Sequence, residues 1–265
     1  MFEFHQDKLR YFNIQVQNAR RHVVPFVEKH KPILSGMRVL EIGCGEAGVL
    51  KAFIEKGCVA VGVELDDPRL VNARLFMEKE LEMGLISFIS KDIYQVDAAT
   101  ELKGKFDIVI LKDVIEHIHD QKKLIAWMKS FLNPEGVIFF GFPPWQMPFG
   151  GHQQMINNKL LSKLPYYHLL PMPLYKWVLK MGGQDATAYA EIKETGISIE
   201  RFEKIVKETG YKVVSKTFYL VNPIYEYKFG WKPREQFKLI SAMPQVRNFF
   251  TSCVYYLIKD NSGSV

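Results

Sequence analysis

Apolar residues in this chain are grouped into short runs, separated by longer stretches with helical spacing. The short runs predict buried parallel strands at 38–42, 59–64, 86–90, 106–112 and 136–142. The stretches between them have the periodicity of amphipathic helices, at 47–55, 68–83 and 121–132. Because helices alternate with apolar strands, the pattern predicts an α/β fold with a doubly wound, mostly parallel sheet.

The flanking segments complete this architecture. Residues 3–30 have the spacing of an N-terminal helix, which Pro25 is expected to interrupt. Residues 197–209 predict a helix that returns to the sheet, and further strands are expected at 211–220 and 251–259. These two strands bring the sheet to seven. The residues between them predict a long connection that contains helices.

The first predicted strand runs into a glycine-rich loop with acidic residues. Gly43, Gly45 and Gly48 fit the pattern G-x-G-x-x-G, in which glycine allows a sharp turn and a close ligand approach. Glu41 precedes this loop and Glu46 lies within it. Both carboxylates would repel the pyrophosphate of a dinucleotide, whereas S-adenosylmethionine (SAM) carries an ammonium and a sulfonium. The acidic loop therefore favours SAM.

Five motifs follow one another along the chain at regular spacings. They are EIGCG at 41–45, VAVGVELD at 59–66, SKDI at 90–93, FDIVILKDVIEHI at 106–118 and LNPEGVIFFGFP at 132–143. Together they resemble the class I (Rossmann-like) SAM-dependent methyltransferases, of the type that acts on small molecules. The resemblance covers residues 37–143 well and 197–220 weakly. It implies methyl transfer to a small-molecule or lipid-like acceptor, at oxygen.

Candidate cofactor-binding residues lie where the predicted strands end. Glu64 ends the second strand, where an acid suits both ribose hydroxyls of SAM and equally those of NAD. The resemblance implies that Asp92 binds the adenine amino group with Ile93 beside the ring, although Asp92 is also suited to a helix N-cap. It implies that Lys112 and Asp113 line the methionyl end. The whole predicted set is Glu41, Gly43, Cys44, Gly45, Glu64, Leu65, Asp92, Ile93, Lys112 and Asp113.

Two histidines are candidates for a general base. In such a transfer, alignment of the acceptor with the methyl group supplies most of the rate enhancement and lowers the activation barrier by roughly 7–11 kcal/mol. A base is needed only if the acceptor loses a proton. His117 follows the fourth strand and His152 begins the segment after the fifth, so either is placed to serve. Each also suits a histidine that caps a loop or packs in a polar pocket. No ligand spacing supports a metal site.

The composition changes after the fifth strand. No Asp or Glu occurs from Gly136 to Gln184. Lysines and aromatic residues are frequent there, namely Lys159, Lys163, Lys176, Lys180, Trp145, Phe149, Tyr166, Tyr167, Tyr175 and Trp177. The segment is too apolar for a disordered linker. It predicts a cationic lid that admits the acceptor and touches a membrane surface through residues 143–190. Alternatively, the aromatic residues pack over the sheet edge or bury a dimer contact.

These features divide the chain into four parts. They are a helical cap (1–36), a SAM-binding core (37–142), a lid insertion (143–196) and the completion of the sheet (197–265). The net charge of +6 is modest. The three cysteines lack metal or disulfide spacing, and we expect free thiols in a cytoplasmic protein without a leader or spanning helix.

Two other functions are consistent with parts of the pattern. An NAD(P)-dependent oxidoreductase or epimerase would share the glycine loop and Glu64, but it is disfavoured by Glu41 and Glu46 and by the lack of a clear Tyr-x-x-x-Lys pair. A non-catalytic protein of the same fold would use the cationic lid to bind a membrane or a protein. Nucleic acid is not an expected substrate, because the fourth strand is not followed by an Asn/Asp-Pro-Pro-Tyr motif. The oligomeric state is left open.

Overall fold

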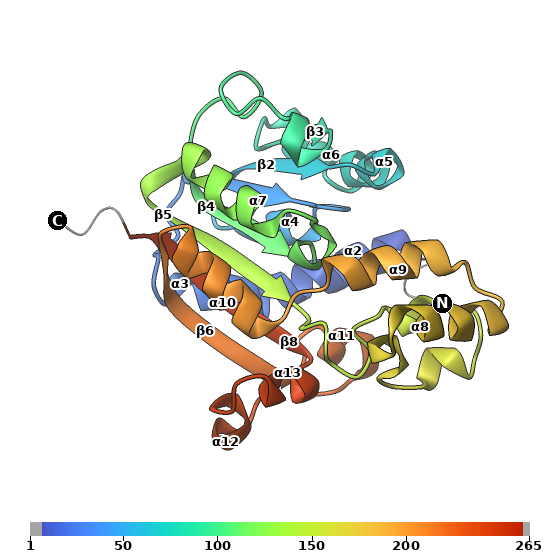
Figure 1. The fold of residues 1–265 in the computed structure, drawn as a ribbon. Helices are drawn as coiled ribbons and strands as arrows, with labels where there is room; N and C mark the ends of the chain where they lie inside the picture. Colours follow the sequence, from blue (N-terminus) through green and yellow to red (C-terminus); the bar gives the residue numbers. More distant parts are fainter. Residues whose placement is uncertain (1–6, 262–265) are drawn as a thin grey trace.

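The computed structural model describes residues 7–261 and has a twisted sheet of eight strands at its centre (Figure 1). The strands are β1 (Arg38–Ile42), β2 (Val59–Glu64), β3 (Ile86–Ser90), β4 (Phe106–Lys112), β5 (Leu132–Phe142), β6 (Tyr211–Val221), β7 (Arg234–Glu235) and β8 (Cys253–Asp260). Their order across the sheet is β3-β2-β1-β4-β5-β8-β6-β7. The pairs among β1–β5 are parallel, whereas β8 pairs antiparallel with β5 and β6. The predicted α/β class is confirmed.

The sheet has one more strand than the seven expected from the sequence. The additional strand, β7, is two residues long and pairs with the end of β6. A two-residue edge strand carries no alternation of apolar and polar positions, so no sequence pattern marks it.

Helices cover both faces of the sheet. One face carries α2 (Lys8–Asn18), α3 (Val24–Glu28), α4 (Gly48–Ile54), α5 (Asp67–Phe76) and α6 (Glu78–Glu82). The other carries α7 (Gln121–Trp127) and α10 (Ile199–Glu208). Successive residues of β1 point to opposite sides, so Val39 enters one core and Leu40 the other. Both faces are thus buried, as a doubly wound sheet requires.

The expectation that Pro25 interrupts the N-terminal helix is wrong. The helix continues through a π-helical turn at Ala19–Val23 and then as α3, with Pro25 in the first turn of α3. The amide of Val24 donates to the carbonyl of Ala19, five residues earlier. This wider turn shifts the carbonyl that the proline ring would otherwise strike, so the chain stays helical.

The next predicted helix, 68–83, is divided into α5 and α6. The break is at Met77, whose side chain is fully buried. The predicted helix at 121–132 is α7 followed by a 3₁₀ turn at Met128–Phe131, and β5 begins at Leu132, earlier than the predicted 136. All three cysteines are buried free thiols. Within the described residues, no helix is long and apolar enough to cross a membrane.

The segment 143–196, here called the lid segment, has its own small core. It contains α8 (Met172–Met181) and α9 (Ala186–Thr195), which lie beside the sheet edge (Figure 1). Tyr167 and Tyr175 are buried inside this core, and Trp145 packs against the ring of His168. Tyr167 and Tyr175 therefore pack inside the lid segment itself, and not over the sheet edge or in a dimer contact as the sequence alternatives had it, while Trp177 is 57% exposed.

His168 holds the lid segment together in its neutral form. Its ring nitrogens are paired, Nδ1 with the amide nitrogen of Gln153 at 2.7 Å and Nε2 with the carbonyl of Trp145 at 2.8 Å. Lys193 of α9 adds hydrogen bonds to the carbonyls of His168 and Leu170. Burial lowers the pKa of His168 from 6.5 to about 4, because a charged imidazole would lose hydration there.

We expect the free energy of unfolding to decrease as the pH falls from 6.5 towards 4. In this range His168 is protonated in the unfolded chain but not in the folded one, so the unfolded state binds more protons. The loss reaches about 3 kcal/mol near pH 4. Urea unfolding followed by tryptophan fluorescence at pH 7 and pH 4.5 measures it. His168→Gln, which keeps a hydrogen-bonding amide but does not titrate, should show a smaller difference; an unchanged difference would contradict this role.

Candidate functional site

A cavity of about 520 Å³ opens at the carboxyl ends of β1, β2 and β4. Ligands of doubly wound sheets lie at this edge. Ten of the twelve residues predicted for the site line the cavity, namely Glu41, Gly43, Cys44, Glu64, Leu65, Asp92, Ile93, Lys112, Asp113 and His117. Gly45 and His152 are not among its lining residues. The strand-end rule therefore predicted which residues line one cavity, and their roles in binding stay a prediction.

The first two glycines of the loop are required by its backbone. Gly43 and Gly45 have φ of 70° and 54°, in the left-handed region where a side chain is strained. A Cβ on Gly43 would also overlap Val114, and one on Gly45 would overlap the guanidinium of Arg69. The amide of Gly45 donates to Glu64 at 2.8 Å. Gly45 thus supports the site by fixing Glu64, although it does not face the cavity.

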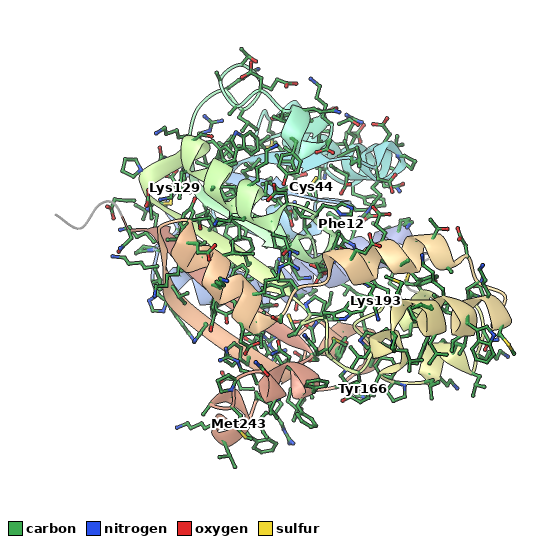
Figure 2. The ribbon with its side chains drawn as sticks, in the orientation of Figure 1. Phe12, Cys44, Lys129, Tyr166, Lys193 and Met243 are labelled. Atoms are coloured by element: carbon green, nitrogen blue, oxygen red, sulfur yellow. The ribbon has the colours of Figure 1, made fainter. Side chains whose placement is uncertain are left out.

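The third glycine brings the N-terminal helix against the loop. A Cβ on Gly48 would lie 2.6 Å from Cβ of Gln15 and 2.7 Å from the carbonyl of Phe12. This close packing places Tyr11 and Gln15 of α2 on the cavity wall. Figure 2 shows Phe12 of α2 and Cys44 of the loop in the same part of the molecule. Arg20, in the π-helical turn after α2, pairs with Glu55 at the end of α4 and is not among the residues that line the cavity.

Acidic side chains outnumber basic ones around the cavity. The acids are Glu41, Glu46, Glu64, Asp92, Asp113 and Glu191, and the permanent cations are Arg69, Lys91 and Lys112. This excess of negative charge suits a cationic ligand and opposes a pyrophosphate.

Glu41 is the most deeply buried of these acids. Its side chain is 2% exposed, and Oε2 has no hydrogen-bond partner among residues 7–261. Burial raises the pKa of its carboxyl well above the usual value, and the nearby Lys112 ammonium opposes that change. A buried acceptor without a donor costs free energy, so a ligand ammonium at this position would be stabilised.

Glu64 is held by the backbone around it. Besides the amide of Gly45, it accepts hydrogen bonds from the amides of Leu65 at 2.9 Å and Asp66 at 3.1 Å. Arg69 of α5 lies 3.8 Å from its carboxylate and pairs with Glu46 at 2.9 Å. Two carboxylates are thereby brought together by one guanidinium. The sequence did not predict Arg69 as a residue near the glycine loop, because α5 is brought to the loop only by the tertiary fold.

Apolar and polar groups of the β3 exit form another wall of the cavity. Asp92 accepts a hydrogen bond from the amide of Tyr94 at 2.9 Å and so caps the 3₁₀ turn Ile93–Gln95. The helix-cap role considered for Asp92 is therefore present, and its carboxylate also borders the cavity. Leu65, 69% exposed, and the buried Ile93 add apolar surface to the cavity lining.

The exit of β4 holds an ion pair in a strained turn. Lys112 is buried, and its ammonium lies 2.5 Å from the carboxylate of Asp113, which has φ of 58°. Burial raises the pKa of Asp113, but the Lys112 ammonium lowers it by more than burial raises it. The pKa of Asp113 therefore lies below its usual value. Glu116, one turn on, is buried, and both burial and Asp113 raise the pKa of its carboxyl well above the usual value.

His117 and His152 meet at the rim of this turn. Their ring centroids are 5.1 Å apart. His117 borders the open cavity, so water reaches its ring, while the surrounding protein still lowers its pKa below 6.5. Burial, reinforced by His117, lowers the pKa of His152 to about 4. Both imidazoles are neutral near pH 7 and can accept a proton; His117 is the stronger candidate because it faces the cavity.

The sequence and the fold of this chain are similar to those of known proteins. A family model for a methyltransferase domain matches residues 12–216, which is most of the chain. Among curated relatives, an Acinetobacter baylyi protein named ubiquinone biosynthesis O-methyltransferase is 28% identical over 115 residues, covering 43% of this chain and 47% of its own. An Idiomarina loihiensis protein of the same name is 33% identical over 116 residues, covering 43% and 46%. The chain thus aligns with about half the length of these relatives.

Solved structures show the same architecture at low sequence identity. A SAM-dependent methyltransferase from Clostridium acetobutylicum has a TM-score of 0.56 at 14% identity, covering 92% of this chain and 91% of its own. The magnesium protoporphyrin IX methyltransferase of Synechocystis, solved with bound S-adenosylhomocysteine, has a TM-score of 0.52 at 16% identity, covering 98% and 89%. The chain therefore belongs to the methyltransferase-domain family and has the fold of the class I SAM-dependent methyltransferases.

Proposed function

We propose that this protein transfers a methyl group from SAM to an oxygen of a small, lipid-like acceptor. The observation that carries the proposal is the acidic cavity beside the glycine loop, in which Glu41, Glu46 and Glu64 are buried carboxylates. A net negative cavity suits the two cations of SAM and opposes NAD(P). The names of the curated relatives support oxygen as the acceptor atom.

Each part of SAM has a matching group in the cavity. The Glu64 carboxylate is placed for the ribose hydroxyls. Oε1 accepts from the amides of Leu65 and Asp66, whereas Oε2, among the described residues, accepts only from the backbone amide of Gly45 and keeps a lone pair for a ligand hydroxyl. Glu41 supplies an acceptor for the ammonium. Asp92 would accept from the adenine amino group, with Leu65 and Ile93 beside the ring. When bound, SAM supplies a methyl group on a sulfonium, which is already a good leaving group.

The residues at the β4 exit act on the acceptor. Asp113 and its Lys112 partner form a fixed polar floor, which aligns the acceptor oxygen with the methyl group. His117, neutral and facing the cavity, accepts the proton that the hydroxyl loses as the new O–C bond forms. The lid segment contributes Glu191 to the cavity lining, so it borders the place where the acceptor enters.

The lipid-like character of the acceptor is supported by the lid segment. Leu174, Trp177 and Met181 are exposed along one side of α8, at helical spacing, and Lys176 and Lys180 of the same helix are exposed as well. We extend the proposal to a contact of residues 143–190 with a membrane surface, from which an apolar acceptor would enter.

Ligand-dependent melting tests the proposed cofactor. We expect S-adenosylhomocysteine, the product left when SAM loses its methyl group, to raise the melting temperature, because a ligand of the folded state stabilises it by RT ln(1 + [L]/Kd). At a hundredfold excess over Kd the gain is about 2.7 kcal/mol. NAD at the same concentration should leave the melting temperature unchanged. Stabilisation by NAD and none by S-adenosylhomocysteine would overturn the proposal in favour of an oxidoreductase.

A further inference from the structure

The connection between β6 and β8 exposes an unusual amount of apolar surface. It contains α11 (Tyr225–Phe229), α12 (Lys238–Ser241) and α13 (Val246–Phe250). Its exposed apolar side chains, here called the connection patch, are Trp231 at 59%, Phe237 at 61%, Leu239 at 75%, Met243 at 41% and Phe250 at 50%. Five large apolar side chains exposed on one short connection indicate an interaction site.

The same patch is cationic. Lys232, Arg234 and Lys238 are exposed beside these apolar residues and make no ion pair within the described part of the chain. One acid, Glu235, occurs between residues 227 and 248. Elsewhere on the surface many lysines are paired, for example Lys122 with Glu208 and Lys216 with Glu203. The charges of the connection patch are therefore available to an external anionic partner.

The connection patch is joined to the lid segment. The hydroxyl of Tyr166 donates to the carbonyl of Phe249 at 3.0 Å, and the two rings lie 6.4 Å apart. Tyr166 and Met243 are both found along the lower edge of the molecule in Figure 2, where α8, α12 and α13 also lie in Figure 1. The exposed stripe of α8 and the connection patch thus belong to two neighbouring elements with the same apolar and cationic character.

We propose that the connection patch docks on an anionic phospholipid bilayer. Trp231, Phe237 and Leu239 would enter the headgroup region, and Lys232, Arg234 and Lys238 would lie against lipid phosphates and carboxylates. The proposal goes beyond the methyl transfer, since it rests on this surface alone and holds whatever reaction the cavity supports.

A second copy of this chain suits the patch less well than a lipid surface. A twofold contact places the same patch of one copy against that of the other. Three cations would then face their own copies, with Glu235 as the acid within the segment to offset them. Like charges at close range oppose such a contact. An anionic bilayer instead satisfies the apolar and the cationic residues together.

Vesicle co-sedimentation of the full chain tests the proposal. The probes are vesicles of phosphatidylcholine alone and vesicles that also contain phosphatidylserine, at physiological and high salt. We expect the protein to bind the phosphatidylserine vesicles preferentially and to be released by high salt. Lys232→Gln with Lys238→Gln should weaken binding about fivefold per charge. Phe237→Ser with Leu239→Ser should weaken it about tenfold or more.

Matched variants on the opposite side of the molecule control for charge and hydrophobicity. Lys79→Gln with Lys105→Gln removes two exposed lysines, and Val71→Ser with Leu75→Ser removes two exposed apolar residues of α5. Both control proteins should bind as the unmodified protein does. A triple variant measures how much the lid segment contributes to vesicle binding. It carries Gln in place of Lys163, Lys176 and Lys180.

Three results would overturn the inference. The first is an unmodified protein that sediments with neither kind of vesicle. The second is a Phe237→Ser, Leu239→Ser protein that binds as tightly as the α5 control. The third is a dimer, detected by analytical ultracentrifugation, that this double substitution converts to a monomer, which would make the connection patch an interface between copies. Circular dichroism of every variant verifies folding, and the charge variants test the surface without removing apolar packing.

Discussion

Glu64→Ala is expected to lower the affinity for S-adenosylhomocysteine by about 10- to 150-fold. The substitution removes a carboxylate that the amides of Gly45, Leu65 and Asp66 hold in place and that we propose to bind the ribose of the cofactor. Charge-assisted hydrogen bonds of this kind are worth roughly 1.5–3 kcal/mol, which gives that range. Isothermal titration calorimetry measures the change.

The control for this substitution is an acid outside the cavity. Glu82→Ala removes an exposed carboxylate of α6 and should leave the affinity unchanged. Glu64→Gln keeps the size of the side chain and should lie between the two. If Glu64→Ala bound S-adenosylhomocysteine as tightly as Glu82→Ala, the ribose would not be held by Glu64, and the assignment of this end of the cavity would be wrong.

His117→Ala is expected to lower turnover by about 10²- to 10⁴-fold, while the affinity for S-adenosylhomocysteine changes little. A general base contributes a factor of this size to the chemical step. The pKa of His117 lies below 6.5 because burial disfavours the imidazolium. The base is therefore neutral at pH 7, and turnover should decrease only as the pH falls through that lowered pKa. Single-turnover kinetics across pH, with labelled SAM and a hydroxyl-bearing acceptor that is turned over, measure both effects.

Two further histidine variants decide the assignment. His119→Ala removes an exposed histidine that pairs with Glu191 at 3.2 Å on the rim, and it should keep nearly full turnover. His152→Ala tests the second candidate, whose pKa of about 4 makes it the weaker base. If His117→Ala and His152→Ala both retained full turnover, the reaction would need no base, and alignment of the acceptor would account for the rate.

Local sequence patterns predicted most of the sheet and many of the residues that line the cavity. The strands from β1 to β4 begin and end where the apolar runs do, because buried parallel strands need such runs on both faces. The errors concerned helix boundaries, which are set by tertiary contacts and not by the local pattern. The predicted helix 68–83 breaks at Met77, whose side chain is buried, and Pro25 is accommodated by a π-helical turn. Neither event leaves a signal in the neighbouring residues.

The walls of the cavity show the same division. Glu41, Glu64 and Asp92 were found because strand ends of a parallel sheet meet at one edge. Tyr11 and Arg69 were missed, since they come from the flanks of α2 and α5 and reach the cavity only through helix packing. The aromatic residues of the lid segment were predicted to face a membrane surface, but Tyr167 and Tyr175 fill its small core. Residue type alone does not tell whether a tyrosine is exposed or buried.

The contact between Gly48 and α2 couples the first helix of the described chain to whatever occupies the cavity. With no Cβ at this position, the backbone of α2 rests directly on the start of α4, and Tyr11 and Gln15 form part of the wall. A ligand that stiffens the loop must therefore also restrain α2. The amide protons of this helix should exchange with solvent more slowly once the cavity is filled. Hydrogen exchange in α2 would therefore report whether the cavity is occupied.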